Sequence, residues 1–236
     1  QGVRPGVGPG GGGGSPSGKR RAVDERVALD GVCSLTSSSA VKVGVLDYGM
    51  GNLRSVEKAL VKAGARAFVS DDPAVLATAD LLVVPGVGAF DAAMKVLRQK
   101  KLVAFIRDWV RTGRPYLGIC LGLQLLFESS EEAPGVRGLG LLKGRVVKFR
   151  FADRRMKVPH MGWNEVHPVG PAARDRKALL PASAFFYFVH SYAPRPADKS
   201  VVWATTPYGT DFCSAVAQGA LLATQFHPEK SGPTGL

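Results

Sequence analysis

The 236-residue sequence predicts an α/β fold, a doubly wound, mostly parallel sheet with helices on both faces. Short apolar runs alternate with amphipathic helical stretches between residues 41 and 128. Glycine-rich turns follow the apolar runs that end at Leu46, Val84 and Ile119. In such sheets ligands bind beyond the carboxyl ends of the strands, so we expect these turns to meet at one site.

The strands and helices of the first half follow from these patterns. Asp72-Pro73 is a typical helix start, and Gly64 is a typical helix end. The predicted strands are residues 41–46, 67–69, 81–84 and 116–119. The predicted helices are residues 53–63, a short helix opening at 72–73, and residues 89–98, 102–111 and 121–128.

The second half, from Gly144 on, is richer in strands than in helices. We predict strands at residues 146–149, 185–189, 201–205, 214–217 and 221–225. His227-Pro228-Glu229 follows the last of them, and seven residues remain after Glu229. A domain of this kind normally covers its last strand with another helix. We therefore predict one domain over residues 41–236, truncated at its C-terminus.

Residues 1–40 differ from the rest of the chain. Residues 2–18 are mostly Gly, Pro and Ser, and residues 10–14 are five consecutive glycines. Such a stretch cannot bury enough apolar surface to fold, so we predict a disordered leader over residues 1–40. A targeting segment, an upstream extension and an artefact all remain open, although Asp24 and Glu25 argue against a targeting peptide.

The composition excludes several classes of protein. The three cysteines form no disulfide framework, which favours a reducing compartment: the cytoplasm, or an organelle if the leader is a transit peptide. The longest apolar runs are shorter than the roughly 18 residues that span a membrane. The four histidines show no zinc-ligand spacing, so we expect no metal.

The net charge of +12 raises the question of nucleic-acid binding. The basic residues are spread along the chain, and the sequence carries no nucleic-acid-binding motif. We therefore expect neither a nucleic-acid nor a membrane partner. The remaining uses of a positive surface are solubility, an acidic partner or steering of an anionic substrate.

The pentapeptide Gly118-Ile119-Cys120-Leu121-Gly122 is the strongest functional pattern. It is the cysteine version of the Gly-x-Ser-x-Gly nucleophile elbow, a tight strand-to-helix turn. Glycine is needed on both sides because a side chain there would clash. The turn also places Cys120 at a helix N-terminus, which favours the thiolate.

A thiolate nucleophile needs a base, and the base needs an orienting group. His227 and Glu229 supply both within three residues, so the sequence predicts acyl transfer by a cysteine nucleophile. His160, His167 and His190 are the competing bases. Neither His160 nor His190 is followed by a carboxylate at the right distance, and His167, directly before Pro168, is predicted to lie in an exposed loop. Of the other cysteines, Cys33 lies in the leader, and Cys213 is interpreted as a packing residue at a strand edge.

Residues 41–232 resemble a known family. The elbow with Gln124, together with His227-Pro228-Glu229, resembles the Cys-His-Glu triad of class I glutamine amidotransferases. Four further strings resemble, within that class, the glutaminase subunits of imidazole glycerol phosphate synthase. These strings are Asp47-Tyr48-Gly49-Met50-Gly51-Asn52-Leu53-Arg54-Ser55-Val56, Pro85-Gly86-Val87-Gly88-Ala89-Phe90, Pro159-His160-Met161-Gly162-Trp163-Asn164 and His190-Ser191-Tyr192.

The resemblance implies an activity and a partner. Glutamine would be hydrolysed to glutamate and ammonia without a cofactor. The ammonia would pass through a channel to a (βα)8-barrel cyclase, either a separate chain or a fused domain. The cyclase would make imidazole glycerol phosphate and aminoimidazole-carboxamide ribotide in histidine biosynthesis.

The resemblance also implies roles for residues outside the triad. An oxyanion hole needs backbone N–H groups. Leu121, directly after the nucleophile, supplies one, and the segment with Val87 and Gly88 supplies the other. The implied glutamine-binding residues are Gly86, Gln124, His190, Ser191 and Tyr192. The implied partner interface consists of Asn52, Met161, Trp163 and Lys230, with residues 159–164 forming a loop.

Three other functions compete with this interpretation. One is the glutaminase of another class I enzyme, in pyridoxal phosphate, purine or anthranilate synthesis. Another is a partner-binding domain without activity, which would be expected to lack part of the triad. The third is a cysteine protease or esterase, for which the sequence shows no substrate-groove pattern.

Overall fold

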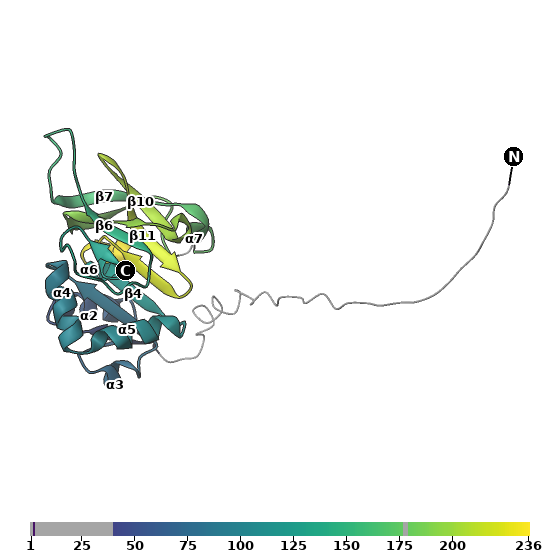
Figure 1. Cartoon of the computed structure of the whole chain (residues 1–236). Helices are drawn as coiled ribbons and strands as arrows, with labels where there is room; N and C mark the ends of the chain where they lie inside the picture. The colour runs from purple at the N-terminus through teal and green to yellow at the C-terminus, as the bar shows by residue number, and fades with distance from the viewer. Residues whose placement is uncertain (1, 3–39, 177–178) are drawn as a thin grey trace.

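A twisted sheet runs through the structure, with β4, β10, β11 and β7 among its strands (Figure 1). It has nine strands in the order β2-β1-β3-β4-β12-β11-β10-β7-β8. The computed structural model describes Gly2, residues 40–176 and residues 179–236. The predicted leader, apart from Gly2 and Ala40, lies outside these residues.

The first five strands in this order run parallel to one another, and the parallel arrangement predicted for the first half of the chain is present. They are β2 (Arg66–Ser70), β1 (Lys42–Leu46), β3 (Leu81–Gly86), β4 (Tyr116–Cys120) and β12 (Leu221–Thr224). The other four strands are antiparallel to theirs. They are β11 (Thr210–Gln218), β10 (Val202–Tyr208), β7 (His160–Pro168) and β8 (Ala184–His190). A three-stranded sheet joins β5 (Ser129–Ser130), β6 (Gly144–Lys148) and β9 (Tyr192–Pro196).

Helices cover both faces of the parallel strands because successive side chains of a strand point to opposite faces. Val43 and Val45 of β1 pack with Val56 of helix α2. Leu46 lies in a different cluster, with Met94 of α4 and Ile106 of α5. The helices are α2 (Leu53–Lys62), α3 (Pro73–Leu76), α4 (Phe90–Gln99), α5 (Leu102–Arg111), α6 (Leu121–Gln124) and α7 (Gly170–Arg174). Three 3-10 turns are η1 (Lys199–Val201), η2 (Pro228–Lys230) and η3 (Gly232–Gly235). The predicted fold class is confirmed.

The helix predicted over residues 121–128 is wrong beyond Gln124. A continuing helix would use the carbonyl of Leu125 for the N–H of residue 129. That carbonyl instead accepts from Leu139 N at 2.8 Å, and the carbonyl of Phe127 accepts from Gly140 N. A segment farther along the chain therefore ends the helix after one turn.

The loop predicted for residues 159–164 is also wrong. His160 begins β7, whose residues pair in register with β8, Met161 opposite Val189 and Trp163 opposite Tyr187. His167, which was assigned to a loop, is likewise a residue of β7. The sequence prediction also missed β5, β9 and α7.

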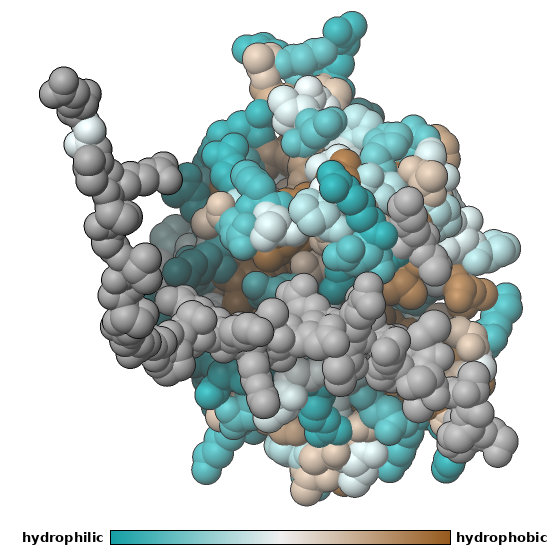
Figure 2. All heavy atoms as spheres, turned by 90° about the vertical axis from the view of Figure 1, so that its right-hand side faces the viewer, coloured by the Kyte–Doolittle hydropathy of each residue, from teal (hydrophilic) through white to brown (hydrophobic). Residues whose placement is uncertain are grey.

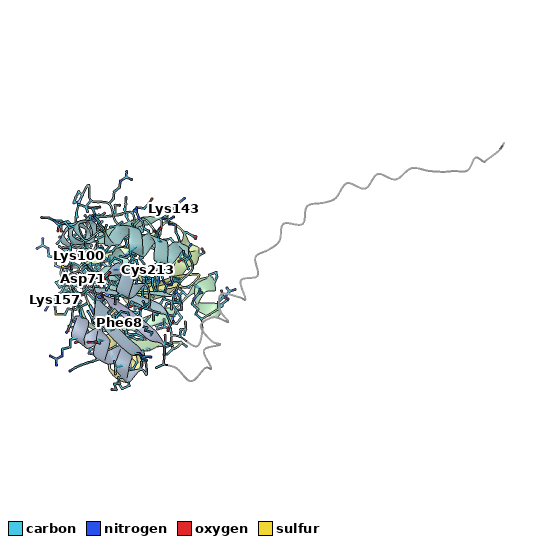
Figure 3. All side chains as sticks on the ribbon, turned by 90° about the horizontal axis from the view of Figure 1, so that it is seen from below. Phe68, Asp71, Lys100, Lys143, Lys157 and Cys213 are labelled. Carbon is cyan, nitrogen blue, oxygen red and sulfur yellow. The ribbon has the colours of Figure 1, made fainter. Side chains whose placement is uncertain are left out.

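Cys213 lies inside the sheet rather than at a strand edge, because β11 pairs with both β10 and β12. Its side chain is buried in the main apolar cluster, which agrees with a packing role. Figure 3 labels Cys213. It also labels Asp71 and Lys100, which form a separate, solvent-exposed ion pair of 2.8 Å.

Hydrophilic residues predominate on the face of the molecule that Figure 2 shows. No helix in the described part of the chain is long and apolar enough to cross a membrane.

The glycines of the elbow are required by close packing. A Cβ on Gly122 would lie 1.8 Å from the carbonyl oxygen of Val84 on β3. A Cβ on Gly118 would lie 2.9 Å from the carbonyl oxygen of Gly122. The chain after Cys120 thus runs directly against the neighbouring strand.

Gly122→Ala should therefore destabilise the fold by about 3 kcal/mol or more, because the Val84 carbonyl belongs to a central strand that cannot move aside. Chemical denaturation measures the change. Gly64→Ala is the control: its φ is +89° but its surroundings are open, so only the backbone cost of about 1–2 kcal/mol is expected. Equal losses in the two variants would contradict the packing argument.

Candidate active site

Cys120 ends β4 in a strained backbone conformation. Its φ of 53° and ψ of −104° are unusual for a residue with a side chain. Strain of this kind is concentrated at functional sites. The residue is paired in register with Gly86 of β3, so the sulfur lies beside the segment predicted to form the oxyanion hole. The predicted elbow is therefore present.

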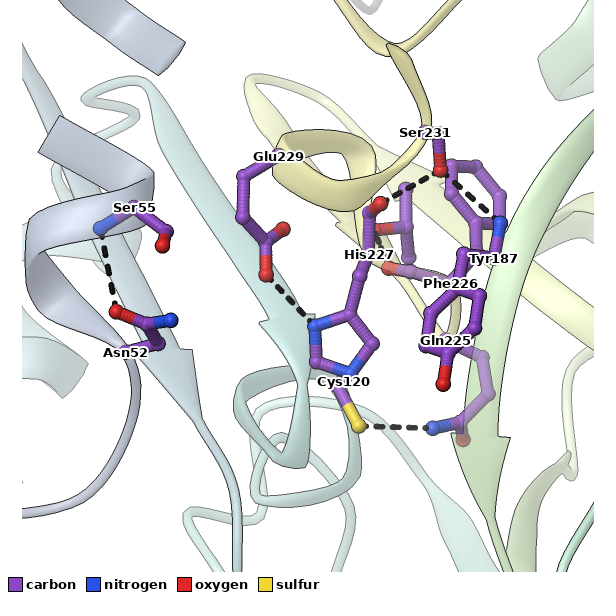
Figure 4. Close-up of polar contacts among 10 residues, drawn as sticks. Asn52, Ser55, Cys120, Tyr187, Gln225, Phe226, His227, Glu229 and Ser231 are labelled. Atoms are coloured by element: carbon purple, nitrogen blue, oxygen red, sulfur yellow. Dashed lines mark hydrogen bonds and ion pairs between the residues drawn. The ribbon is translucent and has the colours of Figure 1, made fainter. Parts of the chain in front are cut away.

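His227 and Glu229 form the contact that the sequence predicts. His227 Nδ1 lies 2.8 Å from Glu229 Oε1, and the two side chains are only 2% and 4% exposed. Because a carboxylate can only accept, Nδ1 carries the proton and donates. Nε2 has no hydrogen-bond partner among the described residues, and Cys120 lies next to the ring (Figure 4). This nitrogen is placed to exchange a proton with the sulfur.

The loop that carries His227 is fixed to β8. His227 N donates to the carbonyl of Tyr187 at 2.9 Å. The hydroxyl of Ser231 donates to the carbonyl of His227 at 2.6 Å and accepts from Tyr187 N at 3.0 Å (Figure 4). The sequence analysis missed Tyr187 and Ser231, because their contribution depends on a tertiary contact between segments 44 residues apart.

The surroundings of His227 favour its charged form. Burial alone would lower the pKa of the imidazole, but Cys120 and Glu229 together outweigh burial and raise the pKa to about 9. An imidazolium beside the sulfur stabilises a thiolate, which is the nucleophilic form of cysteine.

The competing histidines are unsuitable as bases. Burial lowers the pKa of His160 to about 4 and that of His190 to about 3, so both rings are neutral near pH 7. The two rings are hydrogen-bonded to each other, with His160 Nδ1 3.1 Å from His190 Nε2. His167 is half-exposed and lies 3.4 Å from Glu165.

The predicted oxyanion residues adjoin the cysteine. Leu121 opens α6 directly after it. Gly88 has a φ of +107°, which favours glycine, and Val87 beside it is 39% exposed. A Cβ on Gly86 would lie 2.1 Å from the hydroxyl oxygen of Tyr48, so Gly86 itself is closely packed, in contrast to the exposed Val87.

Four of the predicted glutamine-binding residues, Gln124, His190, Ser191 and Tyr192, lie close together. Gln124 Nε2 donates to the carbonyl of Tyr192 at 3.0 Å and to Gln225 Oε1 at 3.1 Å. His190 ends β8, Tyr192 opens β9, and Ser191 lies between them. Gln225 contacts the sulfur and was not predicted as a site residue; its only sequence signal is its position two residues before His227.

Two of the predicted interface residues, Trp163 and Lys230, lie near each other beside Tyr187. Met161 and Trp163 are 62% and 56% exposed. The ring of Tyr187 lies between Trp163 and Lys230, with its centroid 6.3 Å from the Trp163 ring and 5.9 Å from Lys230 Nζ. Asn52 caps α2, its Oδ1 accepting from Ser55 N, and lies across Glu229 from Tyr187 (Figure 4).

Within residues 40–176 and 179–236, no group of three or more His, Cys, Asp or Glu side chains is arranged to hold a metal ion.

Comparison with known proteins agrees with this geometry. Residues 44–235 match the family model "Glutamine amidotransferase class-I". A solved structure described as a glutamine amidotransferase has a TM-score of 0.63 and 25% identity over 79% of this chain and 90% of that chain. PurLQS from Thermotoga maritima shares the fold, with a TM-score of 0.61 and 19% identity over 81% of this chain and 89% of that one. Fold and site together thus define a class I glutamine amidotransferase.

Curated relatives indicate which family within this class the chain belongs to. The imidazole glycerol phosphate synthase subunit HisH of Rhodopirellula baltica is 50% identical over 82% of this chain and 93% of its own length. HisH of Syntrophotalea carbinolica is 52% identical over 81% of this chain and 94% of its own length. The chain belongs to the HisH family, and the resemblance found from the sequence strings is confirmed.

The pKa of His227 predicts how activity changes with pH. The sequence predicts that the His227 imidazolium is the acid that protonates the amide nitrogen leaving as ammonia, and its raised pKa keeps this charged form well above the ordinary value of 6.5. The rate constant for glutamine hydrolysis should therefore hold as pH rises through 8 and fall as pH passes about 9. A pH–rate profile with the partner subunit present measures this. A basic limb near 6.5 would contradict the raised pKa.

The two cysteines of the described region should react differently. An electrophilic glutamine analogue should label Cys120, which adjoins His227. Cys213 should stay unlabelled, because burial raises the pKa of its thiol to about 12. Mass spectrometry of the digested protein identifies the labelled residue, and Cys213→Ala is the control. Labelling at Cys213 would show that the nucleophile is misassigned.

Proposed function

We propose that this chain hydrolyses glutamine to glutamate and ammonia as the glutaminase subunit of imidazole glycerol phosphate synthase, in histidine biosynthesis. The observation that carries the proposal is the buried His227–Glu229 pair beside the strained Cys120, in a chain about half identical to HisH subunits.

The first half of the reaction forms a thioester. The Cys120 thiolate attacks the side-chain amide carbon of glutamine, and the carbonyl oxygen becomes an oxyanion. The His227 imidazolium gives its Nε2 proton to the amide nitrogen, the C–N bond breaks, and ammonia leaves. Glu229 keeps the ring oriented and stabilises its charged form.

The second half releases glutamate. The now neutral His227 takes a proton from water while the hydroxide attacks the thioester carbon. The C–S bond breaks, the thiolate returns, and the imidazolium is restored for the next cycle. The γ-carboxylic acid of the product loses its proton to solvent, which balances the reaction.

Backbone groups next to the sulfur supply the oxyanion hole. Leu121 N–H is one donor, and a peptide of the Val87–Gly88 segment is the other. The positive φ of Gly88 and the exposure of Val87 support this assignment, because a peptide flanked by glycines can rotate toward the substrate. Gly86, Gln124 and the His190–Tyr192 segment hold the amino-acid part of glutamine.

The partner is a cyclase subunit with a (βα)8-barrel, which receives the ammonia through a channel and makes imidazole glycerol phosphate and aminoimidazole-carboxamide ribotide. It docks on the surface formed by Asn52, Met161, Trp163 and Lys230. Exposed Met and aromatic side chains are typical of interface cores, and the exposure of Met161 and Trp163 supports this surface. The thiol nucleophile suits a reducing compartment such as the cytoplasm.

A glutaminase assay tests the proposal. Ammonia released without an acceptor is lost, so a coupled enzyme should keep its oxyanion hole incomplete until the partner binds. Alone, the chain should therefore hydrolyse glutamine slowly. Adding the cyclase and its nucleotide ligand should raise the rate at least roughly tenfold, about 1.4 kcal/mol in the barrier. Cys120→Ala should lower the stimulated rate by at least about 10⁴-fold while leaving ammonia-dependent cyclase activity intact. A full rate without the partner would contradict the activation, and an active Cys120→Ala would contradict the function.

The docking surface has its own test. Trp163→Ala should weaken binding of the cyclase by about 30-fold or more, the loss typical of a central aromatic residue. Leu179→Ala, at an apolar side chain 52% exposed outside the proposed surface, should leave the affinity unchanged. Calorimetry or surface plasmon resonance measures both. Equal affinities for the two variants would place the interface elsewhere.

A further inference from the structure

Gln225 contacts the nucleophile, yet the triad gives it no role. Its Nε2 lies 3.6 Å from Cys120 Sγ, and its side chain is completely buried (Figure 4). It follows the end of β12, two residues before His227, so the strand that carries the base also carries this amide. A buried amide beside a reacting atom is oriented by its other contacts, and these contacts determine which end faces the sulfur.

The carbonyl of Tyr192 fixes that orientation. A carbonyl can only accept, so the atom of Gln124 that lies 3.0 Å from it must be the N–H2 end. The same nitrogen lies 3.1 Å from the Gln225 amide, which must present its oxygen. The other end of Gln225, its N–H2 group, therefore faces the sulfur.

A second chain of hydrogen bonds holds the Tyr192 carbonyl in place. The carbonyl also accepts from His190 Nδ1 at 2.8 Å. In a neutral ring Nε2 is then the acceptor, so His160 Nδ1 donates to it. His160 Nε2 in turn accepts from Asn164 Nδ2, which is independently oriented by donating to the carbonyl of Pro207 at 2.8 Å. Every donor and acceptor in this series of hydrogen bonds is consistent with the orientation of Gln225.

We propose that Gln225 is a further catalytic residue, a fixed N–H donor to the Cys120 sulfur. A hydrogen bond to a charged acceptor is stronger than one to a neutral acceptor, so a fixed donor favours the thiolate over the thiol. The Gln225 donor also keeps the Cys120 sulfur on the side of the His227 ring that carries Nε2. The inference rests on the proposed role of Cys120 as nucleophile.

Two variants test the donor separately from the fold. Gln225→Glu keeps an oxygen for Gln124 to donate to but replaces the N–H2 group with a second oxygen. Gln225→Leu removes both groups. Each should lower kcat about 10- to 100-fold, the range expected for a hydrogen bond to a charged group, with KM for glutamine changed less than about threefold. The rate of Cys120 alkylation by iodoacetamide at pH 7 should fall in parallel, and more in Gln225→Glu than in Gln225→Leu.

Gln218→Glu is the matched control, because Gln218 is exposed at the end of the neighbouring strand β11. It should leave kcat, alkylation and the melting temperature unchanged. Alkylation within twofold of the wild-type rate in a folded Gln225 variant would overturn the inference, as would a loss confined to KM. If wild-type Cys120 itself is not alkylated, and Cys120→Ala retains activity, the proposed function fails rather than the role of Gln225.

Discussion

The close contact between Gly122 and the Val84 carbonyl is the constraint on which the site depends. Because no side chain separates the turn from β3, the chain can leave β4 with Cys120 in a strained conformation and enter α6 at once. The same approach pairs Cys120 with Gly86, the residue directly before the Val87–Gly88 segment. The nucleophile and the proposed oxyanion donors are thus positioned by one packing contact.

His227 reaches this turn from the end of β12, a strand that runs parallel to β4. β12 lies next to β4, and the loop after it is fastened to β8 through Tyr187 and Ser231. Tyr187 also packs between Trp163 and Lys230 on the proposed docking surface. A partner bound to this surface would therefore contact the surroundings of Tyr187, whose carbonyl accepts from His227 N. Docking and the position of His227 are thus physically connected through Tyr187.

The sequence predicted the strained turn at Cys120 and the His227–Glu229 contact because their signals are local: glycines beside Cys120, and Glu229 two residues after His227. It misjudged features that depend on distant segments. The pattern around Leu125 predicts a helix, but the Leu125 carbonyl accepts a hydrogen bond from Leu139 N instead. Gly162 is typical of a loop, but its pairing with β8 places it in a strand. Gln225 was missed because its position two residues before His227 does not by itself indicate a role; its proposed role follows from contacts with Gln124, 101 residues away, and with Cys120.

The central claim is that the folded enzyme holds His227 in its charged form beside Cys120. Nitrogen NMR of the ¹⁵N-labelled imidazole, recorded across pH, measures the charge on this ring directly. The account predicts an imidazolium that persists to about pH 9 in the wild type. In Cys120→Ala the transition should move to lower pH, because the thiolate contributes to the raised pKa. A neutral ring at pH 8 in the wild type, or the same transition in both proteins, would contradict the account.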